Sequence, residues 1–320
     1  MRSRRVILIA LLLGGCGRSG DVSRPTPLAL TDLPAGTVLT VASGETGSAV
    51  RGVRLVIAGH EYRSDDDGRV RLDAVAAGGA LMDVDSDGYL ARQTLVRSAS
   101  ETRFTLWPRL SPTGLDEEFT RRLIYTSGAD GALPGEQALE RIVARSVALI
   151  PTGELRADAV AMANLAAGAD RMTDLTEGKV RYQIADRAPD GAVPVELVVN
   201  AKEEYFATNI QAAAFAQLTL NSRSEITGAR IAFRDMSLAQ RQKVAHHELG
   251  HTLGLGHSPF TGDLMHCCSP QTDAMTPRER LAVQLAYQRR PGNRFPDNDR
   301  DSRSQSAGGS STRVIVCDPR

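Results

Sequence analysis

Apolar and polar residues alternate with a period of two over the first third of the chain, from about residue 37 to residue 107. Val53, Leu55 and Ile57 alternate with other residues in the spacing of a strand that buries one face. Turn signals rich in Asp and Gly separate such runs, at 65–68, 78–79 and 85–88. The pattern therefore predicts a small all-β sandwich, which we place at residues 36–108.

Beyond residue 109 the pattern is a mixture of helical and extended periods. Helical spacing of apolar residues predicts helices over 136–149 and 154–167. Strands are predicted at 121–125, 180–184, 193–199, 216–221 and 229–233. Helix-start signals occur at 237–240 and at 276–279. Largely segregated helices and strands favour an α+β domain over residues 109–290. The Arg-, Ser- and Asp-rich stretch 291–320 predicts a mobile tail.

The N-terminus carries an apolar run, 6–13, behind three arginines. The run is far shorter than the roughly 20 residues that span a bilayer, but it suits a signal peptide, which we place at residues 1–15. The following residues 16–35, rich in Gly, Ser, Pro and Thr, predict a flexible tether.

The sequence Leu13-Gly14-Gly15-Cys16 resembles the lipobox of bacterial lipoproteins. This resemblance implies cleavage before Cys16 and acylation of Cys16. The protein would then lie in the bacterial cell envelope or outside the cell, held to a membrane by its N-terminal lipid. The alternative is an ordinary signal peptide with a chance cysteine.

Composition adds mainly exclusions. Hydrophobic residues make up 42% and charged residues 24%, as in a globular protein. With 38 Lys+Arg against 38 Asp+Glu, the net charge of zero argues against a nucleic-acid partner. Four cysteines are too few for a disulfide scaffold. The oligomeric state stays undetermined.

The unusual feature is the clustering of histidines in residues 246–257, which read HHELGHTLGLGH. On a helix, His247 and His251 project from one face and can bind one metal ion. Glu248 follows the first ligand and can act as a general base. Gly254 can end the helix with a positive φ, which lets His257 return as a third ligand.

This spacing is the metzincin signature, and with Ser258 it resembles the matrixin branch most closely. Met265, eight residues after His257, resembles the Met-turn beneath the metal. The resemblance implies an α+β fold with a twisted sheet above the cleft and an active-site helix beneath. It also implies a Zn²⁺-dependent endopeptidase that hydrolyses peptides or proteins with a zinc-bound water and Glu248 as the base. It covers residues 225–287 well and 117–225 by element order alone.

Two departures from the matrixin pattern are visible. No cysteine-containing latency segment precedes the motif, because Cys16 is the only earlier cysteine. Cys267 and Cys268 follow the Met-turn, where matrixins usually have an aromatic residue and Pro. One hypothesis is that Cys317 forms a disulfide with Cys267 or Cys268, and a second zinc site is the weaker alternative. His246 and His266 are expected to be packed or solvated rather than functional.

The β region resembles the carboxypeptidase regulatory-like domain, an accessory sandwich. Asp83, Asp85, Asp87 and Gly88 imitate the start of an EF-hand calcium loop, but its twelfth position is Thr94 instead of Glu. A turn is therefore favoured over a calcium site. The rival to an enzyme is a surface binding lipoprotein that uses the sandwich and keeps a non-catalytic zinc fold. The intact Glu248 speaks against it, since structural zinc needs no base.

Overall fold

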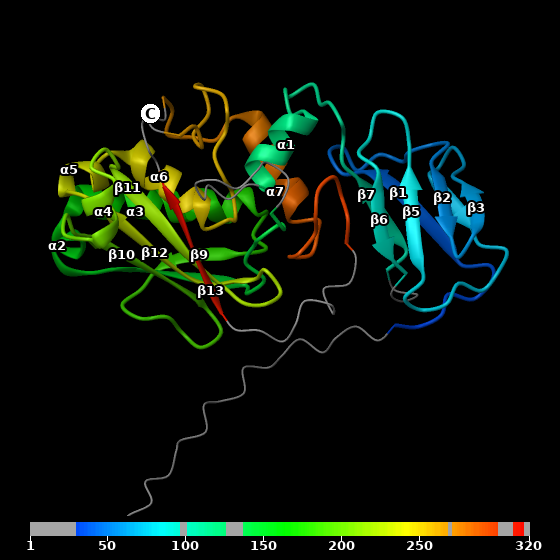
Figure 1. The fold of residues 1–320 in the computed structure, drawn as a ribbon, viewed down its shortest axis with the longest axis horizontal. Helices are drawn as coiled ribbons and strands as arrows, with labels where there is room; N and C mark the ends of the chain where they lie inside the picture. The colour runs from blue at the N-terminus through cyan, green and yellow to red at the C-terminus, as the bar shows by residue number, and fades with distance from the viewer. Residues whose placement is uncertain (1–29, 97–100, 126–136, 268–270, 300–309, 317–320) are drawn as a thin grey trace, which may run out of the picture.

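Seven short strands build the N-terminal β domain of the computed structural model, which describes residues 30–96, 101–125, 137–267, 271–299 and 310–316 (Figure 1). The strands are β1 (Val38–Ser43), β2 (Arg54–Ile57), β3 (His60–Arg63), β4 (Arg69–Arg71), β5 (Leu81–Asp85), β6 (Arg92–Leu95) and β7 (Arg103–Leu106). They form one sheet of order β4-β1-β7 and another of order β3-β2-β5-β6. Residues of both sheets, such as Val41 and Leu55, are buried in one shared core. The predicted all-β region is confirmed.

Two features at the edges of the β domain differ from the sequence prediction. Leu33, expected in the flexible tether, is 1% exposed and its backbone pairs with Ala76. The last residues of the predicted tether are therefore part of the β domain, while residues 1–29, with the predicted signal peptide and Cys16, lie outside the described residues. Asp83 and Asp85 lie in strand β5 rather than in a loop between helices. This placement agrees with the interpretation as a strand and turn.

The second domain is built on a six-stranded mixed sheet of order β13-β11-β12-β10-β8-β9. Its strands are β8 (Ser146–Pro151), β9 (Arg181–Ile184), β10 (Val193–Val199), β11 (Ala214–Leu220), β12 (Ile226–Phe233) and β13 (Ser311–Val316). Strands β9, β8, β10 and β12 are parallel to one another, and β11 is antiparallel to both β12 and β13. The strands that the alternation predicted at 193–199, 216–221 and 229–233 are present.

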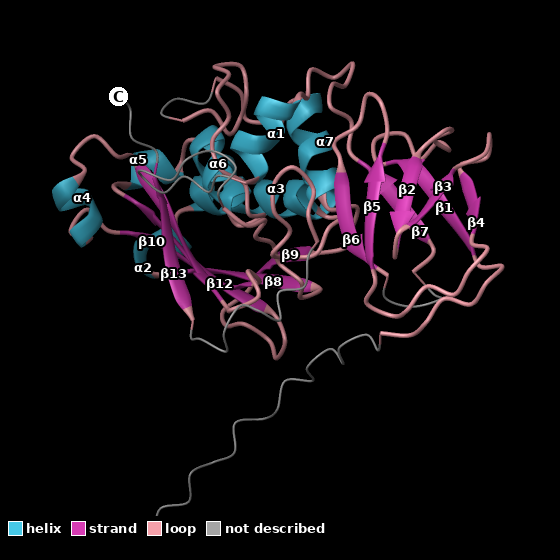
Figure 2. Cartoon of the chain, turned by 45° about the vertical axis from the view of Figure 1, so that its right-hand side comes forward, coloured by secondary structure: helices cyan, strands magenta, loops and turns pink. Residues whose placement is uncertain are grey.

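The helices α1, α3, α6 and α7 lie together on one side of this sheet (Figure 2). The helices of the chain are α1 (Glu117–Ile124), α2 (Gly153–Ala157), α3 (Ala159–Leu175), α4 (Glu204–Thr208), α5 (Met236–Ala239), α6 (Gln242–His251) and α7 (Pro277–Ala286). Their apolar faces and the sheet share one large core that includes Phe119, Leu165 and Leu249. The α+β class is confirmed. None of the described helices is long and apolar enough to cross a membrane.

Two predicted elements are wrong in type. The helix expected over 136–149 is not found in the described part of that stretch, residues 137–149, whose end enters strand β8. The run from Val147 to Ile150 is apolar without a break, so it fits a strand buried on both faces as well as a helix. The strand expected at 121–125 is instead the second half of α1, whose N-cap Asp116 accepts a hydrogen bond from Phe119 N.

The described residues of the predicted mobile tail, 291–299 and 310–316, are built into the fold. Residues 291–299 lie between the two domains, where Asp297 is fully buried. Residues 311–316 form β13 at the edge of the sheet, with Ile315 buried in the core. The Arg- and Ser-rich composition of the stretch did not predict these elements, because their packing depends on a few buried residues. Residues 300–309 and 317–320 lie outside the described part.

A buried polar junction joins the two domains. Arg289, which follows α7, donates two 2.6 Å hydrogen bonds to Asp297 and one to the Thr105 carbonyl oxygen of β7. Arg92 of β6 pairs with Asp299 at 2.9 Å. Trp107, at the end of the β domain, is fully buried and lies under the Arg289 guanidinium, 4.7 Å from its ring centroid. The β domain is therefore fixed to the second domain by charge pairs and packing.

Candidate metal centre

Helix α6 carries the first part of the candidate site and is preceded by a separate short helix. Asp235, rather than a residue of the predicted capping box at 237–240, is the N-cap of α5 and accepts from Leu238 N. The helix is interrupted at Arg241, and α6 begins at Gln242. The sequence signal found a helix start in the right place but missed the break before the histidines.

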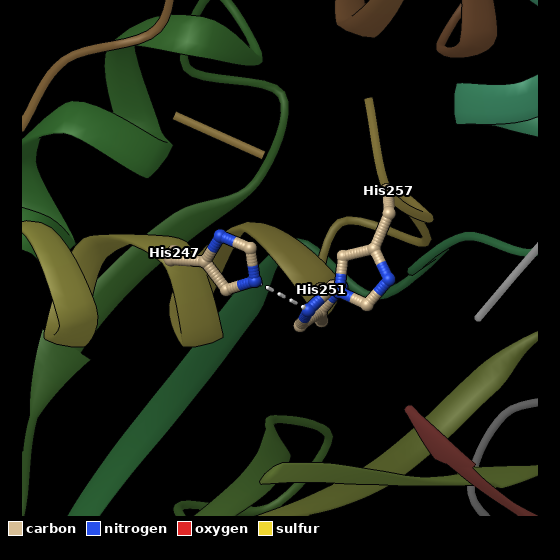
Figure 3. Close-up of side chains that lie close together, drawn as sticks. All are labelled: His247, His251 and His257. Carbon is tan, nitrogen blue, oxygen red and sulfur yellow. Dashed lines mark hydrogen bonds between the residues drawn. The ribbon is translucent and has the colours of Figure 1, made fainter. Parts of the chain in front are cut away.

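Three histidines converge at the C-terminal end of α6 (Figure 3). His247 and His251 lie one turn apart on the helix, with their Nε2 atoms 3.1 Å apart. His257 returns from the following turn and stacks on His247, with ring centroids 5.4 Å apart. Among the described residues they form the one group of three metal-ligating side chains, with their ligand atoms all within 4.8 Å of one another. The structure thus brings together all three predicted ligands.

The surroundings orient the imidazoles of His247 and His251 and favour the neutral form of His251 and His257. The Nδ1 of His247 lies 2.7 Å from the Leu264 carbonyl oxygen, and that of His251 lies 2.8 Å from the Leu255 carbonyl oxygen. Such contacts leave the Nε2 atoms directed at a metal. Burial, reinforced by His247, lowers the pKa of His251 well below its ordinary value and that of His257 to about 3. Neutral imidazole is the form that binds metal, so a divalent cation such as Zn²⁺ fits this donor set.

Gly254 makes the turn that returns His257 to the site. Its φ is +89°, a backbone conformation that residues with a Cβ rarely adopt. A Cβ at this position would also overlap the carbonyl oxygen of Glu140. Glycine is therefore required at the predicted turn for two reasons, the backbone conformation and the close packing. Helix α6 itself ends three residues earlier, at His251.

Met265, the predicted Met-turn residue, lies against α6, the helix that carries His247 and His251. It is fully buried, and a Cβ on Gly250 of α6 would overlap its sulfur atom. The backbone around it is held by Glu279 of α7, whose carboxylate accepts from Met265 N at 2.7 Å and from Leu264 N at 3.2 Å. The helix start predicted at 276–279 is confirmed and forms a capping box, since Glu279 also accepts from Thr276 N.

A second buried carboxylate, missed by the sequence reasoning, fixes the loop between His257 and Met265. Asp263 is fully buried, accepts from the Ser258 hydroxyl, and pairs with the Arg278 Nε at 3.0 Å. The Arg278 guanidinium lies over the ring of Phe260, 4.1 Å from its centroid. The Asp263 contacts span the loop and α7, so no local sequence pattern marks them.

The remaining candidates have mixed outcomes. Glu248 lies on α6 beside His247 and is 1% exposed. His246 is also buried, and its ring nitrogens lie 2.7 Å from the Asp273 carbonyl oxygen and 3.2 Å from that of Asn164. It is packed, as expected. Cys267 is disulfide-bonded. The predicted pairing of Cys317 with Cys267 or Cys268 involves Cys317, which lies outside the described residues.

The comparisons with known proteins point to the same segment. A family model described as Matrixin matches residues 178–284, which include β9 to β12, the zinc-binding motif and most of α7. This part of the chain is a matrixin-like metzincin domain. No curated protein matches the chain. The matrixin match and the three converging histidines together indicate a zinc metallopeptidase, and hence a hydrolase acting on peptides or proteins.

Proposed function

We propose that the chain is a zinc-dependent endopeptidase in which His247, His251 and His257 hold the metal and Glu248 is the general base. The observation that carries the proposal is the convergence of the three histidines, within 4.8 Å, inside the segment that matches the matrixins. Three protein ligands leave a coordination position for water or substrate, which distinguishes a catalytic zinc site from a structural one.

The chain's own residues divide the work of hydrolysis. Zn²⁺ supplies Lewis-acid chemistry, since it lowers the pKa of water and polarises a peptide carbonyl. Glu248, buried beside His247, accepts the proton of the attacking water and passes it to the leaving amine. The carbonyl oxygens of Leu264 and Leu255 keep the imidazoles oriented while this happens.

The location of the enzyme is a second part of the proposal. The arginine-led apolar run and Cys16 support export and a lipid anchor in the bacterial cell envelope. Metabolic labelling with a radioactive fatty acid should mark the wild-type chain and leave Cys16→Ser unlabelled. Equal labelling of both would exclude Cys16 as the lipid attachment site.

The enzymatic proposal is tested with a quenched-peptide library and with casein. The wild-type chain should cleave, a chelator should stop cleavage, and added Zn²⁺ should restore it. Glu248→Ala should keep one zinc per chain by elemental analysis but lose cleavage, because the metal remains and the base is gone. Cleavage retained by Glu248→Ala would refute the assigned base.

The same assay separates the enzyme from the rival surface binding protein. A chain that binds zinc yet cleaves no peptide under any condition would favour the binding protein, with the β domain as its binding part. Glu248→Gln, nearly the same size as the wild-type side chain, is the matched control for changes in packing.

A further inference from the structure

Strand β11 is the part of the sheet next to the candidate metal centre. Among the described strands it is the one against which α6, the helix of His247 and His251, packs most extensively. It is also antiparallel to its inner neighbour β12. Without β13, β11 would be the edge of the sheet. An exposed edge offers a row of backbone donors and acceptors to which an extended peptide can add as a further strand.

In this structure the edge is taken by the chain's own C-terminal region. Strand β13 pairs with β11 in antiparallel register from Leu220↔Ser311 to Phe215↔Val316, so it covers nearly all of β11 (Figure 1). It arrives from the far end of the sequence, about 90 residues after its partner. Any peptide that binds the same edge must displace it.

Side chains of β13 hold it in place at two points. Ile315 is fully buried in the main core. Arg313 pairs with Glu140, whose carboxylate is 5% exposed, and donates a hydrogen bond to Gln137. The backbone carbonyl of Glu140 is the group that packs against Gly254 in the metal-binding turn. The anchor of β13 therefore shares a residue with the packing behind His257.

We propose that β13 is an autoinhibitory strand, which occupies the edge of β11 where an extended peptide substrate binds. This inference rests on the proposed peptidase activity. The strand and the substrate compete for the same backbone groups, so the affinity for substrate falls in proportion to the fraction of molecules with a free edge. The enzyme is thereby held at low activity by its own C-terminal segment.

The first experiment removes the strand. A chain truncated before Ser310 should cleave extended peptides with a kcat/KM raised at least about tenfold over the full chain, because its edge is always free. Cys317→Ser in the full chain is the matched control, since it removes the same cysteine together with the disulfide predicted for it but keeps β13, and it should gain much less. Circular dichroism and zinc content verify that the truncated chain is folded.

The second experiment locks the strand and does not depend on the truncated chain folding. Thr219 and Thr312 face each other across the two strands. Thr219→Cys combined with Thr312→Cys should form a cross-strand disulfide, abolish cleavage while zinc stays bound, and regain activity on reduction. The single variants and the parent chain, treated with the same reductant, are the controls.

The third experiment measures binding without catalysis. In the Glu248→Ala background, a fluorescent peptide of sequence Ser-Thr-Arg-Val-Ile-Val should bind the truncated or reduced chain and not the locked one. Binding without cleavage by any variant would refute the peptidase, and with it the autoinhibition, while showing that the edge of β11 binds an extended peptide. Cleavage that neither truncation nor the lock alters, with no peptide binding, would overturn the strand inference and leave the peptidase standing.

Discussion

This protein contains two buried clusters of ionisable side chains. The unfavourable free energy of burying a charge is avoided in opposite ways in the two clusters. The metal centre gathers three imidazoles, His247, His251 and His257. The domain junction gathers two arginines with two aspartates, of which Arg289 and Asp297 are fully buried as a pair. Both clusters are largely shielded from water, and an isolated charge in such a place would be strongly destabilising.

The pKa shifts show the difference. At the metal centre, burial lowers the pKa of His251, and the neighbouring His247 and His257 lower it further. At the junction, burial would lower the pKa of Arg289, but Asp297 and Asp299 outweigh burial and raise it. The junction compensates the charge of Arg289 with aspartates, whereas burial favours the neutral form of His251 and His257. Neutral imidazoles with converging nitrogens can bind a cation, and the compensated pair of Arg289 and Asp297 holds the two domains together.

The sharpest way to break this comparison is to remove a histidine. His251→Gln should lose bound zinc and all peptide cleavage, and with them the stability that metal binding confers, about 4 kcal/mol at a zinc concentration 1,000-fold above Kd. Elemental analysis and thermal unfolding with and without chelator measure both effects. His60→Gln, at an exposed position of β3, is the control. Full zinc content in His251→Gln would remove His251 from the ligand set.

At the junction the expected loss is one of stability alone. Arg289→Met leaves Asp297 buried without its main partner, which should lower the free energy of unfolding by about 3–5 kcal/mol. Zinc content should not change. In the double variant Arg289→Met with Asp297→Leu, most of the stability should return, because no buried charge remains. Urea unfolding of the three proteins is the measurement, and equal stability of the single and double variants would contradict the account.

The pair of Glu140 with Arg313 lies between these extremes. Burial raises the pKa of Glu140 to about 7 from 4.5, although Arg313 lowers it. Between these values the folded state holds a proton that the unfolded chain has released, so stability falls as pH rises from 4.5 through 7. The total change is at most about 3 kcal/mol. Glu140→Gln should flatten the pH profile of urea unfolding over this window, and an unchanged slope would assign it to other groups.

The smallest effect is expected from the backbone support of the metal centre. Glu279→Ala removes the acceptor of Met265 N and Leu264 N, and the Leu264 carbonyl orients His247. Zinc affinity should fall on the order of tenfold, as for other groups behind metal ligands. Glu279→Gln keeps an acceptor oxygen and should lose less. A competition titration with a fluorescent zinc chelator measures the difference. Equal zinc affinities of Glu279→Ala and the wild-type chain would show that the turn around Met265 is stable without Glu279.

The candidate site was predictable in unusual detail because its chemistry is local. A helix turn brings His247 beside His251, and Gly254 can adopt the turn that returns His257, so three ligands lie within eleven consecutive residues. The carboxylates that hold the site together were less visible. Glu279 was read only as a helix cap, and Asp263 was not read at all, because their partners lie on other elements.

The fold was predicted best where one face of an element meets water. Strands β2 and β10 alternate cleanly and were found, whereas β8 is apolar on both faces and was taken for the end of a helix. The tail was the largest error. Its charged residues suggested solvent exposure, but Asp297 is buried against Arg289, and Arg313 is partly buried against Glu140.

The sequence by itself determined the ligand set, the helix beneath it and the class of each domain, because these depend on neighbours a few residues apart. Only the tertiary structure decided that the β domain is fixed to the second domain through Arg289 and that β13 covers the edge of β11. Both depend on pairings between residues far apart along the chain. Burial makes such pairings strong, and no periodicity records them.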